Sequence, residues 1–398
     1  MTERLYYHNS FLREFDAHVL SCEREGERWR IVLDRTAFYP TSGGQPHDLG
    51  RLGDARVLEV AGATDEKVIH YASAAVEPGP VRGEVDWPRR FDHMQQHTGQ
   101  HLLSAVFLDL FKFPTVSFHL GREVSTIDLE APSVPAWHLL EAEHRTNKII
   151  FDDRVVSVRF GTAAELAEAG VRKTVDRDGV LRVVEIDGID RQPCGGTHLA
   201  RTGQAGLLLI RRIERRRDAW RLEYVCGFRA LATARGDFAT LAKAADILGC
   251  GLPEVPGGVA KVLDERSAQH GALKRLQERL SENEARELLA RSPTSNGAAP
   301  RIISAAIDDA TPGYLNLLAA RLAAEAGVIA LLAGKTTGHL VFAQTRGGSC
   351  DVGALLRDNI KKFGGKGGGS RDFAQGSVPD PSNADQLLYL AKEALAAK

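Results

Sequence analysis

Two short segments, far apart in the chain, carry side chains that bind transition metals. His97 and His101 lie four residues apart in the segment Asp92–Ser104 (DHMQQHTGQHLLS), and Cys194 and His198 enclose a Gly-Gly-Thr turn. If the first segment is helical, one turn brings both imidazoles onto the same face. The glycines of the second segment let the backbone bend until thiolate and imidazole converge. One sulfur and three nitrogens are a donor set that suits Zn²⁺.

The spacing of the histidines leaves the choice of ligands open. His93 lies four residues before His97, so this pair has the same spacing as His97 and His101. A helix-capping or phosphate-contacting role is the alternative for His93. Taken singly, the histidine pair also fits a polar helix face, and the CGGTH segment also fits a glycine turn with a buried cysteine. Together they predict a metal site.

The segment from His97 to His101 reads His-Thr-Gly-Gln-His. A zinc protease needs a glutamate in the second position of such a helical segment, where it acts as the base. The threonine found there argues against protease activity.

The bulk properties are those of a globular protein. The chain has 398 residues, which predicts two or three domains, with 43% hydrophobic and 26% charged residues. The balance of 51 basic against 52 acidic residues neither supports nor excludes RNA binding, so any RNA contact depends on local patches. The first 20 residues carry no secretory signal, and the most apolar stretch, Leu315–Leu332, is interrupted by Arg321 and Glu325. These two charges predict a packed helix and strand and no membrane segment, and the five cysteines, which show no regular spacing, predict a reducing cytoplasm.

The pattern along the chain predicts an α+β protein of four parts. Residues 1–87 form a small β barrel, 88–227 an α+β core with the metal ligands, 228–291 a helical hairpin, and 298–398 a small α/β domain. In the barrel, strands are expected at Trp29–Leu33 and Ala55–Val60. In the core we expect a helix capped by Asp92 and running to Phe111, strands at 155–160 and 180–186, and a helix at 162–168.

The second half of the chain is expected to begin with two helices. They extend from Phe228 to Leu289 and are broken at Gly251–Gly258, where two prolines occur. Ser292–Gly297 is predicted to be a linker. Beyond it we expect strand, helix, strand, strand and a last helix, at 301–307, 315–326, 328–333, 340–343 and 385–397.

The motifs resemble those of a known family. Asp92–Ser104 together with CGGTH resembles the editing domain of alanyl-tRNA synthetases and their free-standing relatives, the AlaX alanyl-tRNA editing proteins. The resemblance extends to Leu33–Thr36 (LDRT), to the glycine-rich Phe38–Gln45 (FYPTSGGQ), and to Lys361–Ser370 (KKFGGKGGGS), which is similar to the signature of the C-terminal domain of those synthetases. It implies a zinc set of four residues that leaves His93 outside: His97, His101, Cys194 and His198.

The resemblance implies an activity. Because the β-rich segment starts within a few residues of Met1, no ATP-using aminoacylation domain is expected, and the chain is similar to the long form of AlaX, which edits without charging. We expect a zinc-dependent hydrolase that removes serine, or glycine, from mischarged alanine tRNA. Zinc could activate water, polarise the carbonyl or only orient the substrate, since a site with four protein ligands is usually structural. The alternative is a non-catalytic tRNA-binding protein with a structural zinc.

Further site residues are expected in the glycine-rich motif and beside it. Gly43 and Gly44 allow backbone amides to approach the substrate, Gln45 offers a hydrogen bond to the ribose or the amino acid, and His93 is a further substrate contact. Thr36 resembles the threonine with which family members sense a serine hydroxyl. Such a hydroxyl partner favours serine over alanine as the group removed.

Two basic regions are candidates for contact with tRNA. The denser region is the run from Arg211 to Arg217, with the candidates Arg211, Arg212, Arg215 and Arg216. The other contains Lys362 and Lys366, among glycines whose amides could hold phosphate. It lacks the Gly-Lys-Ser/Thr ending of a Walker loop. DHH-type phosphoesterases share this C-terminal domain, but the Asp-His-His motif is absent here. The resemblance implies that the domain holds tRNA or a partner subunit, so a homodimer through this region is a further expectation.

Overall fold

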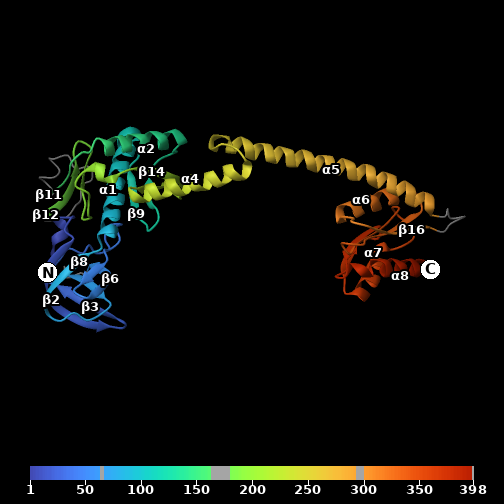
Figure 1. Cartoon of the computed structure of the whole chain (residues 1–398), viewed down its shortest axis with the longest axis horizontal. Helices are drawn as coiled ribbons and strands as arrows, with labels where there is room; N and C mark the ends of the chain where they lie inside the picture. The colour runs from blue at the N-terminus through green and yellow to red at the C-terminus, as the bar shows by residue number, and fades with distance from the viewer. Residues whose placement is uncertain (63–66, 163–179, 293–299, 397–398) are drawn as a thin grey trace. The chain divides into compact units, whose positions relative to one another are not determined.

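The computed structural model describes residues 1–62, 67–162, 180–292 and 300–396. Two compact units are present, Met1–Ala244 and Ala245–Lys398. The fold is α+β, with an N-terminal barrel, several sheets and a C-terminal α/β domain, as the sequence predicted (Figure 1). The finer division into four parts stays a prediction.

The first element of the N-terminal unit is a closed barrel. Its strands follow one another in the order β2 (Glu14–Glu25), β3 (Arg28–Leu33), β7 (Val68–Ala72), β6 (Ala55–Gly62), β5 (Gly50–Leu52) and β8 (Gly79–Val85). Alternating apolar residues of these strands fill the interior, as in β6, where buried and exposed positions alternate at its start. Outside the barrel, β1 (Glu3–Arg4) pairs in parallel with β4 (Arg35–Thr36).

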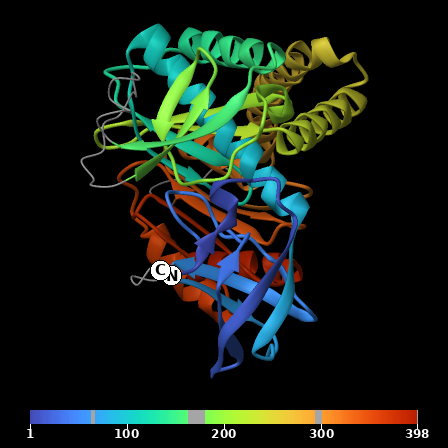
Figure 2. The ribbon, with the colours of Figure 1, turned by 90° about the vertical axis from the view of Figure 1, so that its left-hand side faces the viewer.

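The long helix α1 (Trp87–Phe111) carries the predicted metal ligands from the barrel into the core (Figures 1 and 2). The predicted helix start was wrong. Asp86, not Asp92, is the N-cap, and its side chain accepts a hydrogen bond from the amide of Arg89. Pro88 in the first turn explains the earlier start, because proline is tolerated there without loss of a helical hydrogen bond.

A buried ion pair fastens the start of α1 to the barrel. The guanidinium of Arg90 contacts the carboxylate of Asp48, and both side chains are fully buried. The same guanidinium donates to the carbonyl oxygens of Ala37 at 2.6 Å and Ser10 at 3.0 Å. Because every partner comes from the N-terminal region, this one side chain holds the helix at a fixed place beside the barrel.

Two sheets and a second helix surround α1 and complete the core. One sheet has the order β14 (Leu208–Arg215), β15 (Trp220–Cys226), β10 (Ser125–Leu129) and β9 (Thr115–Leu120). The other consists of β11 (Val156–Thr162), β12 (Val180–Ile186) and β13 (Asp190–Pro193), and α2 (Ala136–Phe151) packs against α1. The strands predicted at 155–160 and 180–186 are confirmed. The helix predicted at 162–168 falls almost entirely outside the described residues.

The two helices expected after the core are present as α4 (Phe228–Leu248) and α5 (Val255–Arg291). The break between them is shorter than predicted. It ends at Glu254, because Pro256 occupies the first turn of α5, where proline is compatible with a helix. The predicted linker Ser292–Gly297 falls almost entirely outside the described residues.

The C-terminal unit contains one five-stranded sheet. Its strands lie in the order β16 (Arg301–Ile307), β17 (Val328–Gly334), β18 (His339–Gln344), β20 (Phe373–Ser377) and β19 (Lys366–Gly369). Three helices pack on it, namely α6 (Pro312–Ala323), α7 (Val352–Ile360) and α8 (Ala384–Ala396). Strand β17 is buried throughout, and β18 is the middle strand of the sheet. None of the helices in the described ranges is both long and apolar enough to cross a membrane.

Candidate metal centre

The structure brings the four predicted ligands together. His97 and His101 lie one turn apart on α1, while Cys194 and His198 follow strand β13. One ligand atom from each residue lies within 4.8 Å of the others, and this is the group suited to a metal that the described residues provide. His93, which spacing left as an alternative, lies outside the group.

Close packing of Gly196 places the CGGTH turn against α1. A Cβ atom on Gly196 would lie 2.2 Å from Cε1 of His97 and 2.8 Å from Oε1 of Gln45. Only glycine therefore allows the turn to approach the helix this closely. Gln45 also holds the turn in place, because its Oε1 accepts a hydrogen bond from the amide of Thr197 at 3.1 Å.

Each imidazole of the group has a polar partner for its Nδ1 atom. Nδ1 of His97 lies 2.8 Å from Oε1 of Gln45. The partner of His101 is a carboxylate, with 3.0 Å between Nδ1 and Oδ2 of Asp190. For His198, Oγ1 of Thr98 lies 3.2 Å away. These contacts leave the Nε2 atoms for a metal ion, the usual arrangement around metal-bound histidines.

The donor atoms have the spacing that zinc requires. The Sγ atom of Cys194 lies 3.5 Å from Nε2 of His97 and 3.3 Å from Nε2 of His198. A tetrahedral zinc ion with ordinary bond lengths has sulfur and nitrogen ligands about 3.6 Å apart. The residues present therefore fit a zinc ion bound by one thiolate and three imidazoles.

Burial and proximity shift the proton affinities within this group. Burial by itself raises the pKa of Cys194, but the neighbouring His97 and His198 outweigh burial and hold the pKa well below its usual value. Burial lowers the pKa of His198 well below its usual value. Burial also opposes protonation of His101, yet hydrogen bonds to Asp190 and Cys194 raise its pKa to about 9. The thiolate, which is the metal-binding form of cysteine, is thus favoured.

The glycine-rich motif forms a tight turn beside the group. Ser42 and Gln45 pair across it, and Gly43 and Gly44 have positive φ values of 51° and 81°. A Cβ atom on Gly44 would lie 2.8 Å from the ring of Phe118, which in turn lies 5.4 Å from the ring of His97. The turn therefore packs directly on a residue that borders the metal ligands.

Other predicted site residues have partners that sequence reasoning did not foresee. Gln45 is fully buried, and besides its contacts to His97 and the Thr197 amide, its Nε2 donates to the hydroxyl of Thr197 at 2.8 Å. A hydrogen bond from Gln45 to a substrate would require one of these contacts to break. Thr36 is also fully buried, and its hydroxyl pairs with Nε2 of the barrel residue His70 at 2.8 Å.

His93 is 4% exposed, and its Nδ1 atom is buried with no hydrogen-bond partner among the residues that the structure describes. Burial lowers its pKa to about 3, and the nearby Arg89 and Arg229 add to the effect. This histidine is therefore neutral at physiological pH, and it lies on the same stripe of α1 as His97.

The predicted RNA-contacting arginines lie on β14 and the turn that follows it. Arg211 forms an ion pair with Asp237 of α4, and Arg212 and Arg216 both pair with Glu214. The guanidinium of Arg215 lies 5.2 Å above the ring of Trp220. In the C-terminal unit, Lys362 donates to Asn359, and Lys366 is exposed on the edge strand β19.

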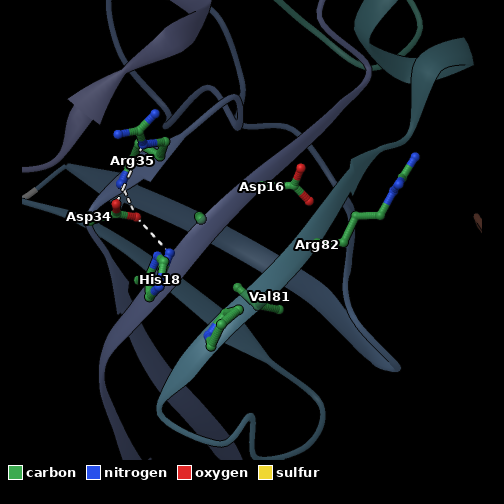
Figure 3. A pocket seen from close by; sticks show the side chains of 8 residues that line it. Asp16, His18, Asp34, Arg35, Val81 and Arg82 are labelled. Atoms are coloured by element: carbon green, nitrogen blue, oxygen red, sulfur yellow. Dashed lines mark hydrogen bonds and ion pairs between the residues drawn. The ribbon is translucent and has the colours of Figure 1, made fainter.

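Two surface hollows lie elsewhere in the N-terminal unit. One, of about 450 Å³, borders the barrel strands β2 and β8, and Figure 3 shows the Asp34 carboxylate there facing the backbone of His18 and Arg35. The other, of about 470 Å³, is lined by residues near the N-terminus, among them Tyr7. Neither contains a predicted site residue.

Sequence reasoning missed two residues of the metal centre. Asp190 is 7% exposed and Thr98 is fully buried, although both side chains are polar. Thr98 lies directly after the ligand His97 on α1, and Asp190 lies four residues before Cys194. Closeness to the ligands in sequence was the available signal, but it does not say which neighbour points inward.

Comparison with known proteins agrees with this geometry. Residues 181–223, which include the CGGTH turn, match the family model described as the threonyl and alanyl tRNA synthetase second additional domain. Residues 299–397 match the DHHA1 domain. The chain thus combines a segment similar to the synthetase additional domain with a match to the DHHA1 domain.

Similarity to individual proteins extends over nearly the whole chain. The alanyl-tRNA editing protein AlaX-L of Pyrococcus horikoshii is 29% identical over 99% of this chain and 98% of its own length. The alanyl-tRNA editing protein Aarsd1 of Mus musculus is 29% identical over 97% and 96%, respectively. An alanine–tRNA ligase of Methanoregula boonei is 31% identical over all of this chain but only 44% of the ligase. The resemblance to long-form AlaX editing proteins is confirmed.

Proposed function

We propose that the protein is a free-standing editing hydrolase that cleaves the ester of mischarged alanine tRNA, releasing serine and, as a second substrate, glycine. The relatives that match over nearly their full length are named alanyl-tRNA editing proteins. The observation that carries the proposal is the convergence of four metal-binding side chains within 4.8 Å. The five cysteines are free thiols, which agrees with activity in the cytoplasm.

Zinc is the proposed cofactor, with His97, His101, Cys194 and His198 as its ligands. When bound at such a site, zinc lowers the pKa of a water molecule or polarises a carbonyl group. The chain's own contribution is to bind and orient the ester. Gly43 and Gly44 lie in the turn beside the proposed ligands. Because glycine has no side chain, their backbone can approach the substrate closely.

Three further residues complete the proposed site. Gln45 acts through His97, which it holds, because its buried amide is already engaged by protein groups. His93 is a neutral, buried imidazole one turn before His97, and it contacts the substrate with an uncharged ring. Thr36, which is hydrogen-bonded to His70, provides the hydroxyl group that favours serine over alanine.

A deacylation assay tests this function. Purified protein is incubated with alanine tRNA charged with serine, glycine or alanine, with and without a chelator. We expect release of serine and glycine, sparing of alanine, and loss of activity with chelator and in Cys194→Ala. The matched control is Cys250→Ala, since Cys250 is a free thiol and is not part of the metal group. Equal turnover of all three substrates, or full activity of Cys194→Ala, would refute the proposal.

A second function, binding of tRNA without catalysis, is favoured by the ligand number. Four protein ligands can close a zinc site, and closed sites are usually structural. This alternative predicts that the charged tRNA binds and that no amino acid is released beyond the uncatalysed rate. The same assay, with binding measured in parallel, separates the two functions.

The partner is proposed to be mischarged alanine tRNA. On the core, the arginines at 211, 212, 215 and 216 contact its phosphates, although the ion pairs with Asp237 and Glu214 must then be exchanged. On the C-terminal unit, Lys362 and Lys366 lie next to the glycines of β19, whose open edge leaves backbone amides for phosphate. A homodimer through this unit is a further proposal, which sedimentation analysis can test.

A further inference from the structure

The hydrogen bonds around the metal group indicate which nitrogen of His97 and of His101 carries a proton. Oε1 of Gln45 accepts from the backbone amide of Thr197, so it is the amide oxygen that faces His97. A carboxylate can only accept, so Nδ1 of His101 must donate to Asp190.

The third imidazole has a partner that can also accept. Oγ1 of Thr98 accepts from the amide of Leu199 at 3.2 Å and retains a second lone pair for Nδ1 of His198. The rings of His97 and His101 therefore carry a proton on Nδ1, and the hydroxyl of Thr98 can accept one from the third ring. A proton on Nδ1 leaves Nε2 as the atom that can bind a metal ion.

The three partners are unequal, because only Asp190 offers a carboxylate. Its side chain is 1% exposed and that of His101 is 6% exposed, so water screens their hydrogen bond little. Hydrogen bonds to a charged acceptor are about twice as strong as neutral ones. The Asp190 carboxylate is thus the strongest constraint on any of the three rings.

The position of Asp190 in the fold links it to a second ligand. It opens strand β13, opposite Ile186 of β12, and the same strand leads directly to Cys194. The β12–β13 hairpin therefore positions both the thiolate and the carboxylate that orients His101. The register of this strand pair determines where both groups lie.

We propose that Asp190 is a positioning residue that sets the metal affinity of the site, by holding the His101 ring and increasing the electron density on its Nε2 atom. The inference rests on the proposed metal site but not on hydrolysis of any substrate. Partners of this kind alter metal affinity by about 10- to 100-fold when they are removed.

Zinc binding measured by competition with a chromophoric chelator tests this role in the full chain, without RNA. We expect Asp190→Asn, which keeps an oxygen but loses the charge, to bind zinc about tenfold more weakly, and Asp190→Ala up to about 100-fold more weakly. The matched control is Asp187→Asn, the same change at an exposed position of the same hairpin. It should bind zinc as the unchanged protein does.

Cobalt substitution adds a spectroscopic result that a merely structural role would not give. Visible absorption bands of bound Co²⁺ report the ligand geometry, so we expect them to change in Asp190→Asn and to stay unchanged in Asp187→Asn. Should Asp190→Ala fail to fold, Asp190→Asn, which has nearly the same shape, still decides the question. Unchanged zinc affinity and cobalt spectrum in Asp190→Asn, or an equal loss in Asp187→Asn, would overturn the inference. Failure of deacylation alone would bear on the proposed function and not on this role.

Discussion

Substitution of Gly196 by alanine tests the packing of the metal centre most severely. The new methyl carbon would lie 2.2 Å from Cε1 and 2.4 Å from Nδ1 of His97, far inside van der Waals contact. The ring cannot simply move away, because it is 1% exposed and its Nδ1 is held by Gln45. Overpacking costs about 1–3 kcal/mol and loss of one hydrogen bond about 0.5–1.5 kcal/mol. We therefore expect about 1.5–4.5 kcal/mol less stability.

Urea unfolding of the metal-free protein measures this loss, and zinc competition measures the damage to the site. The neighbouring Gly195→Ala is the control, since its Cβ would lie 3.6 Å from the hydroxyl of Tyr7, an ordinary contact. We expect Gly195→Ala to keep its stability and zinc affinity, while Gly196→Ala loses stability and at least tenfold in affinity. If Gly196→Ala behaves like the unchanged protein, or if both variants lose equally, the packing argument is wrong.

Three further predictions concern pH, a buried ion pair and RNA. Burial lowers the pKa of His93 to about 3, below its unfolded value of 6.5, so its neutral form contributes stability that is complete above pH 6.5 and is lost as the pH falls towards 3. Unfolding free energies at pH 8 and pH 5 should therefore differ by about 2 kcal/mol more in the unchanged protein than in His93→Gln, and equal differences would contradict this. Asp48→Asn leaves the fully buried Arg90 without its counter-charge and should lower the free energy of unfolding in urea by about 3–5 kcal/mol. The control is Glu14→Gln, which removes an exposed ion pair and should lower it by less than about 1 kcal/mol. Similar losses in the two variants would contradict the importance of the buried pair. Lys366→Gln should reduce the slope of the logarithm of the tRNA binding constant against the logarithm of the salt concentration by about one. An unchanged slope would mean that Lys366 does not contact a phosphate.

Spacing indicated a metal site, because histidines four apart on a helix share a face and a double glycine allows Cys194 and His198 to converge. Spacing did not choose between His93 and His101, and the family resemblance supplied the set of four residues that the structure brings together. The barrel and the C-terminal α/β domain were also predictable, since their strands carry clear apolar runs.

The remaining features depend on contacts between distant parts of the chain. Gln45 meets His97 across 52 positions, and Asp190 meets His101 across 89, so no local pattern indicates either pair. The start of α1 was misplaced because Asp86 and Asp92 are both good caps, and the choice depends on Pro88 and on the anchoring of the helix to the barrel. Tertiary contacts here decide between local alternatives.

The most direct test of the central claim is the zinc content of the purified protein, measured by elemental analysis together with that of Cys194→Ala. We expect one zinc ion per chain in the unchanged protein and a clear loss in the variant, because the thiolate is one of the four proposed ligands. Absence of zinc from the unchanged protein, or an equal content in Cys194→Ala, would contradict it.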